Sequence, residues 1–114
     1  MPERDQLAYL EDILKSCEKI IKYINGKNFD EFSKDEMLAD AVIRNLETIG
    51  EAVKHISESL KLSYSHIEWK KIAGLRDILI HEYFGINYKI LWDITANKIK
   101  KLKSEIEEII TKEK

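Results

Sequence analysis

Hydrophobic residues recur at spacings of three and four along most of the sequence, which is the period of one face of an α-helix. In the first segment they fall at Leu7, Leu10, Leu14, Cys17, Ile21 and Ile24. Ile13 and Ile20 widen this stripe to the breadth expected of a helix in a bundle core. We expect the first helix to end at Asn25-Gly26, because Gly adopts the left-handed cap conformation at little cost.

A second helix is predicted to begin at the capping box Ser33-Lys34-Asp35-Glu36, with Phe32 and Met37 at the positions of a hydrophobic staple. In such a box the Ser side chain accepts from a free backbone N–H, and the Glu side chain reaches back to the cap. The apolar stripe continues at Leu38, Ala41, Val42, Leu46, Ile49, Val53, Ile56 and Leu60. Gly50 lies inside this stripe at a cost of about 1 kcal/mol relative to Ala, so we expect another helix to approach it closely.

Capping signals predict two more helices. Ser65-His66-Ile67-Glu68 forms a second capping box before a helical segment that runs from Trp69 to Phe84. Gly85 can end that segment, and Asn87 can cap a fourth helix. The apolar positions of the fourth helix are Leu91, Ile94, Ile99, Leu102, Ile106, Ile109 and Ile110. Its tail from Lys98 onward is dense in Lys and Glu, and we expect the outer face of this tail to be solvated.

Four helices joined by short connections predict an all-α fold, a mostly antiparallel up-and-down four-helix bundle. The length of 114 residues fits one domain, and no alternating strand pattern or internal repeat is present. Hydrophobic residues make up 44% and charged residues 35% of the chain, which excludes a disordered chain and a membrane-embedded one.

Net charge and cysteine content narrow the possible partners. The formal charge of −2 argues against nucleic-acid binding driven by overall charge, but it permits a local basic patch such as Lys70 and Lys71. One Cys allows neither an internal disulfide nor a thiolate metal cage, and we expect no metal or cofactor. The first residues carry no apolar signal segment and no long apolar run follows, so we expect a cytoplasmic protein without a membrane partner.

The third helical segment concentrates polar chemistry: Arg76, Asp77, His81, Glu82 and Tyr83 stand within eight residues. At about 100° per residue, Asp77 and His81 share a face, so the carboxylate can accept from one imidazole nitrogen and raise the pKa of the ring. Arg76 and Tyr83 also nearly coincide in direction, whereas Arg76 and His81 stand about 140° apart. One copy would not easily aim both groups at one small target, but two copies related by a two-fold axis could.

Such a dimeric site would suit RNA cleavage. Arg recognises phosphate bidentately, and His transfers protons near neutral pH. Attack of a 2′-hydroxyl on the neighbouring phosphodiester needs a base, an acid and cationic support, which two His and two Arg supply without metal. By itself, an Arg and a His five residues apart also fits a salt-bridged helix surface, and the sequence leaves both interpretations open.

The residues around this pair are more specific. W-K-K-I-A-G-L-R-D-I-L-I-H-E-Y-F-G-I, from Trp69 to Ile86, resembles the signature of HepT-like proteins in the HEPN superfamily: Arg, a polar residue, three or more further residues, His, any residue and Tyr. I-R-N-L-E-T-I-G-E-A, from Ile43 to Ala52, is similar to the family's other recurrent stretch. The resemblance covers roughly Asp5 to Ile94 and implies a helical-bundle homodimer with a composite cleft; with the length, it predicts a single HEPN-like domain over residues 1–114.

The resemblance also implies a function. HepT-like proteins are toxins of toxin–antitoxin pairs and metal-independent endoribonucleases, and their antitoxin is a nucleotidyltransferase encoded nearby. By position, Arg76 would bind phosphate, His81 would be the general acid and base, and Asp77 would support them. The antitoxin of some members adds AMP to the motif tyrosine, which would be Tyr83 here. An anionic nucleotide on Tyr83 would then block the cleft by charge and volume.

Two other functions stay open on the sequence. The chain could be a non-catalytic HEPN binding module that docks to, and serves, a nucleotidyltransferase, with Arg76 and His81 in a structural ion-pair network. The net negative charge slightly favours this alternative, because RNA-cutting surfaces usually carry net positive charge. The chain could also be a helical dimer with no activity.

Overall fold

The computed structural model describes the backbone of residues 5–81 and 87–114, and the side chains of residues 5–75 and 87–114. The helices are α1 (Gln6–Ile24), α2 (Phe29–Lys34), α3 (Glu36–Lys54), α4 (Glu58–Ser63), α5 (Trp69–His81), α6 (Tyr88–Asp93) and α7 (Ile99–Glu113). A π-helical turn, η2 (Ile94–Lys98), joins α6 to α7. The described residues contain no strand, so the predicted all-α fold is confirmed.

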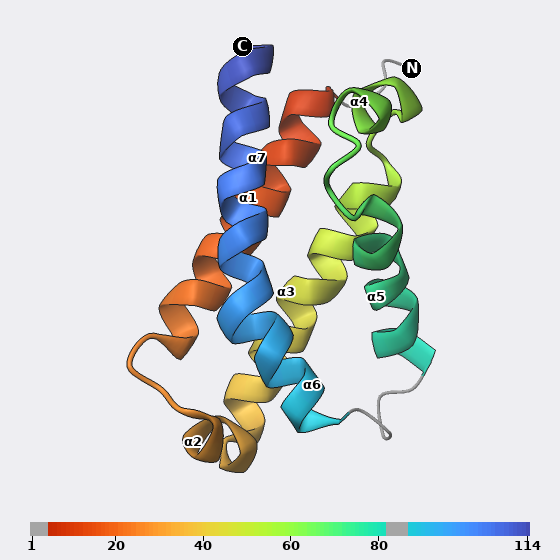
Figure 1. Ribbon diagram of the computed structural model, residues 1–114. Helices are drawn as coiled ribbons and strands as arrows, with labels where there is room; N and C mark the ends of the chain where they lie inside the picture. Colours follow the sequence, from red (N-terminus) through yellow and green to blue (C-terminus); the bar gives the residue numbers. More distant parts are fainter. Residues whose placement is uncertain (1–4, 82–86) are drawn as a thin grey trace.

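Four long helical stretches run alternately down and up the bundle (Figure 1): α1, α3, α5 and the stretch from α6 through α7. The helix α3 packs against both α1 and α5, and α1 packs against α7. The short helices α2 and α4 lie at opposite ends of the bundle, between the long ones (Figure 1). The antiparallel up-and-down arrangement predicted from the sequence is therefore present, with two short helices added to it.

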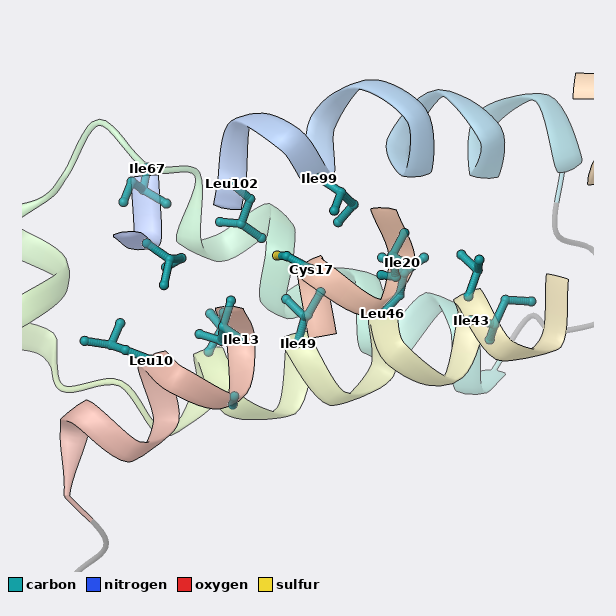
Figure 2. Close-up of a cluster of buried hydrophobic side chains, with 14 of the residues drawn as sticks. Leu10, Ile13, Cys17, Ile20, Ile43, Leu46, Ile49, Ile67, Ile99 and Leu102 are labelled. Carbon is teal, nitrogen blue, oxygen red and sulfur yellow. The ribbon is translucent and has the colours of Figure 1, made fainter. Parts of the chain in front are cut away.

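The core is built from the predicted apolar stripes of α1, α3 and α7. Figure 2 shows Cys17 of α1 among side chains of α3 and α7, including Ile49 and Leu102. Burial of one such side chain contributes about 1.5–3 kcal/mol, so these stripes hold the three helices together. Gly50 is also buried, on a helix that packs against α1 and α5; the close approach of another helix at Gly50 itself stays a prediction.

The predicted start of the second helix at Ser33 is wrong. Ser33 lies within α2, which has its own capping box: Asn28 Oδ1 accepts from Glu31 N at 2.9 Å, and Glu31 Oε1 accepts from Asn28 N at 3.2 Å. The cap of α3 is Asp35, whose Oδ1 accepts from Leu38 N at 3.0 Å. Several residues in this stretch can cap a helix, and the capping box of Asn28 and Glu31 begins the separate helix α2.

The predicted staple of Phe32 with Met37 is also wrong, because Met37 is 84% exposed. Phe32 is fully buried and packs instead against the rings of Tyr88 and Trp92 on α6, with centroids 6.2 and 5.1 Å apart. These aromatic contacts fasten α2 to α6, far along the chain.

The second helix also ends earlier than its apolar stripe suggests. It stops at Lys54, and Ser57 caps the separate helix α4 through its Oγ and Leu60 N, 3.2 Å apart. Gln6 of α1 stabilises this break, because its Nε2 donates to His55 O at 3.1 Å and its Oε1 accepts from Ser57 N at 2.7 Å. The backbone groups freed by the break thus find partners on another helix.

The capping box predicted at Ser65 does not form, since α5 begins at Trp69 after a turn. The Glu68 carboxylate lies 2.7 Å from Lys71 Nζ, and the Trp69 indole N–H donates to Tyr64 O at 3.1 Å. The predicted cap at Asn87 is confirmed, because its Oδ1 accepts from Lys89 N and Ile90 N at 2.8 and 3.3 Å. Phe84 and Gly85, the predicted end of the third helix, lie outside the described residues.

Candidate active site

The helix α5 carries the residues that the sequence analysis singled out. Its start is anchored by Trp69, which is 7% exposed, and by the buried Ile67 just before it. Along its length α5 packs against α3. The polar motif therefore lies on a helix that the core fixes in place, which is the arrangement a binding or catalytic site requires.

Three of the four predicted site residues lie in the last turns of this helix. Arg76, Asp77 and His81 belong to a continuous α-helix, so the i, i+4 relation between Asp77 and His81 holds in the backbone. Their side chains lie outside the described set, so the predicted contact between Asp77 and His81 stays a prediction. Tyr83, the predicted AMP acceptor, lies beyond the described part of α5.

The surface of α5 has free space beside Gly74. A Cβ added at Gly74 would meet no atom within 4 Å. In a regular helix, positions 70, 74, 77 and 81 follow one another along one line, and Lys70 on that line is exposed. By this register, the backbone positions 77 and 81 lie on the same side of α5 as Lys70 and Gly74.

Position 76 falls on another side of α5. It lies seven residues after Trp69. Seven residues fall about 20° short of two full turns, so position 76 is on nearly the same side of the helix as Trp69, whose side chain is buried. This register preserves the wide angle between positions 76 and 81 that the sequence predicts. In one subunit the backbone positions 76 and 81 therefore lie on different sides of the same helix.

A groove of about 360 Å³ runs beside this helix, between α5 on one side and the stretch from α6 to α7 on the other. Leu46 and Ile49 of α3 form its floor, and both are buried. Ile72 and Leu75 contribute the α5 wall. The sequence analysis did not find this groove, because its walls come from segments that only the fold brings together.

The sequence analysis did not predict that lysines would line a groove. Lys71, Lys98 and Lys101 line the groove together with Glu68. The sequence analysis treated the lysine-rich tail as solvated, and both Lys98 and Lys101 are indeed exposed. One feature of the sequence could have predicted this place. Lys98 and Lys101 stand at helical spacings from Ile94 and Leu102, which also line the groove.

Other nucleophilic and metal-binding chemistry is scarce in the described part of the chain. Burial, with a smaller contribution from Glu18, raises the pKa of the Cys17 thiol to about 12, so this thiol stays neutral and unreactive. The side chains of residues 5–75 and 87–114 include no group of three or more His, Cys, Asp or Glu placed to bind a metal ion. None of the described helices is long and apolar enough to cross a membrane.

The fold and the motif define a class: an up-and-down helical bundle whose third long helix ends in an Arg–His motif. The sequence profile of the family described as "Ribonuclease HepT-like" matches residues 13–109, and the chain belongs to this family. No solved structure matches the chain.

Named relatives agree with this family. The chain is 53% identical to a "Putative RNase" of Methanocaldococcus jannaschii, over 96% of this chain and 91% of the relative. It is 47% identical to a protein of the same name in Caldanaerobacter subterraneus, over 93% and 95% of the two chains. It is 38% identical to a "Probable ribonuclease HepT" of Thermococcus cleftensis, over 94% and 97%.

Proposed function

We propose that this protein is a metal-independent endoribonuclease with a composite active site formed by Arg76 and His81 of two identical subunits. The observation that carries the proposal is the match to the HepT-like ribonuclease family across the region that contains the Arg–His motif. The continuous helix through His81 supports it, because the motif spacing then becomes a fixed spatial relation.

In the proposed reaction, the imidazole of one His81 takes the proton from the 2′-hydroxyl, whose oxygen attacks the adjacent phosphorus. The P–O5′ bond breaks, and the second His81 of the dimer, in its protonated form, gives a proton to the leaving oxygen. The products are a 2′,3′-cyclic phosphate and a free 5′-hydroxyl. The Arg76 guanidinium stabilises the charge that builds up on the phosphorane, and Asp77 orients the imidazole.

The proposal requires a homodimer. On one α5, positions 76 and 81 lie about 140° apart, so a single subunit presents them in different directions. A two-fold axis near the end of α5 would bring one subunit's guanidinium beside the partner's imidazole. An isologous contact of this kind repeats the same residues on both sides and gives two Arg and two His in one cleft.

We further propose that the protein is the toxin of a toxin–antitoxin pair and acts on RNA in the cytoplasm. Its antitoxin would be a nucleotidyltransferase encoded nearby that adds AMP to Tyr83. In a regular helix extended past His81, Tyr83 would follow Arg76 by seven residues and share its side. A nucleotide there would compete with the RNA phosphate for the same guanidinium.

Cleavage of RNA in the presence of EDTA tests the proposed activity. The wild-type protein should cut a single-stranded RNA, and His81→Ala should abolish cleavage because proton transfer is lost. Arg76→Ala should lower the rate by a factor on the order of 10²–10³, because it removes support for the transition-state charge. Intact-mass measurement should confirm that each preparation carries no AMP.

A matched control is His55→Ala, which removes an exposed histidine at the end of α3 that does not line the groove, and which should leave the rate unchanged. Equal cleavage by the wild type and His81→Ala would remove His81 from the mechanism. Absence of cleavage by unmodified wild type would favour the second candidate function, a non-catalytic binding module that serves a nucleotidyltransferase. The net charge of −2 is the observation in favour of that module.

A further inference from the structure

The groove beside α5 combines an apolar floor with a charged rim. Its volume of about 360 Å³ lies within the range of small-ligand sites, roughly 300–1,000 Å³. The two walls belong to antiparallel stretches, α5 and the stretch from α6 to α7 (Figure 1), and the lining on the α5 side runs from Glu68 to Leu75. An occupant would need apolar groups for the floor and charged groups for the rim.

Three lysines gather on this rim from both walls. Lys71 comes from α5, Lys98 from η2 and Lys101 from α7. Lys71 pairs with Glu68 at 2.7 Å. In the described part of the chain, no carboxylate lies within 4.0 Å of the Lys98 or Lys101 ammonium group, so two of the three cations have no ion-pair partner.

The same lysines act together on Glu68. The pKa of the Glu68 carboxyl is lowered first by its hydrogen bond and charge interaction with Lys71, and then by the charges of Lys98 and Lys101. The charges of all three lysines therefore act on Glu68, while the groove lining as a whole carries three lysines and three carboxylates, Glu68, Asp93 and Glu105.

The other carboxylates on the rim have partners of their own. Asp93 accepts a hydrogen bond from the Asn97 amide at 2.9 Å. Glu105 lies 3.9 Å from His66 Nε2 near the far end of the groove. Lysines and carboxylates are thus equal in number along the rim, and the three lysines are the ones that act on Glu68.

We propose that this groove binds single-stranded RNA next to the cleaved bond, with Lys71, Lys98 and Lys101 on its phosphates and the apolar floor under a base. Single-strand binding sites combine a cationic track for the backbone with apolar or aromatic surface for the bases. The groove reaches Leu75, the residue before Arg76, so a strand held there leads toward the Arg–His motif. This inference rests on the proposed ribonuclease function, because it names where the substrate lies.

Salt-dependent binding measures the number of phosphates that the lysines hold. The probe is a fluorescently labelled single-stranded RNA of mixed sequence, and the protein is the full-length His81→Ala chain, so that the probe stays intact. Each phosphate contact in a single strand adds about 0.7 to the slope of log K against log salt. Replacement of Lys71, Lys98 and Lys101 by Gln should reduce this slope by about 2 and weaken binding on the order of a hundredfold near 0.1 M salt.

A matched control removes three positive charges elsewhere. Lys19→Gln, Lys34→Gln and Lys112→Gln change the net charge by the same amount at exposed positions, and should leave the slope unchanged. Glu68→Gln should have the opposite effect and tighten RNA binding, because it removes the carboxylate that pairs with Lys71 and interacts with the charges of Lys98 and Lys101. Its pairing with an exposed lysine makes this variant compatible with the fold.

Cleavage by the same variants separates this inference from the proposed function. If wild-type protein cuts RNA, the groove variant should raise KM and leave kcat nearly unchanged, since it alters binding outside the reacting atoms. Equal salt slopes for the groove and control variants would overturn the groove assignment while the nuclease function stands. Reduced slopes without cleavage by wild type would support RNA binding and reject the nuclease.

A protein occupant would give a different result. If the groove were part of the contact between subunits, the groove variant would change the dimer mass measured by sedimentation. Loss of the dimer together with loss of RNA binding would overturn the proposal, because the lysines would then act on a protein surface. An unchanged dimer mass with a reduced salt slope supports RNA as the occupant.

Discussion

Cys17 and Gly74 show how the surroundings of a residue determine what it can do. Burial keeps the Cys17 thiol neutral, with its pKa raised to about 12, so this residue acts as a small apolar side chain in the core. Gly74 has the opposite surroundings, because the space beside its Cα is open. Nothing in the described chain packs where its side chain would be, so packing within one subunit does not explain a glycine there.

Substitution of Gly74 by Ala should therefore stabilise the protein. Gly in a helix interior costs roughly 0.5–1 kcal/mol relative to Ala, and the new methyl group would meet no atom within 4 Å. Urea unfolding at a fixed chain concentration should show an increase of that size in the free energy of unfolding. A decrease would mean that a second subunit or another partner approaches α5 at this point.

Among the elements, the ends of the helices depend on contacts that are remote in sequence. The break between α3 and α4 is satisfied by the side chain of Gln6, and α2 is held to α6 by the ring of Phe32. The π-helical turn before α7 contains Thr95, which is fully buried and donates to Leu91 O at 2.7 Å. This turn shifts the register, so that α6 packs on α2 while α7 packs on α1.

Loss of the Gln6 side chain should weaken the α3–α4 junction. Gln6→Ala removes two hydrogen bonds to backbone groups of His55 and Ser57, and we expect a loss of about 1–2 kcal/mol in the free energy of unfolding. Glu11→Ala, an exposed position on the same helix, is the control and should change stability by less than about 0.5 kcal/mol. Equal stability of the two variants would show that water replaces Gln6 without cost.

For the whole molecule, the proposed activity would depend on the assembly of two subunits. One subunit presents positions 76 and 81 from different sides of α5, and the groove leads along the same helix toward them. A site built this way would be completed only when a second copy contributes its own helix. The chain as a whole carries a formal charge of −2, and three of its lysines line the groove together with three carboxylates.

Specific activity should consequently fall when the protein is diluted below the dissociation constant of the dimer. A composite site exists only in the dimer, so the rate per chain should follow the dimer fraction measured by sedimentation at the same concentrations. The control is cleavage by a dimer cross-linked outside α5, which should keep its specific activity on dilution. A constant rate per chain in the monomer range would show that one subunit contains a complete site.

The sequence by itself determined the features that depend on near neighbours. The stripes of α1, α3 and α7, the turn at Gly26 with φ of +75°, and the cap at Asn87 follow from interactions within a few residues. The spacing of Arg76 and His81 on one helix is local for the same reason, which is why the motif could be placed without a structure. The boxes at Ser33 and Ser65 were predicted wrongly because several polar residues there compete to cap.

Only the tertiary structure decided where α3 ends and what lies beside α5. Gln6 meets His55 and Ser57 across about fifty positions of chain, and Lys71 meets the rim that carries Lys98 and Lys101 from another helix. The spacing of residues along the chain does not predict these contacts, because they depend on how the helices pack against one another rather than on the period within each helix. The helices and the motif are thus local properties of this chain, whereas the groove exists only because α5 and α7 are held apart over α3.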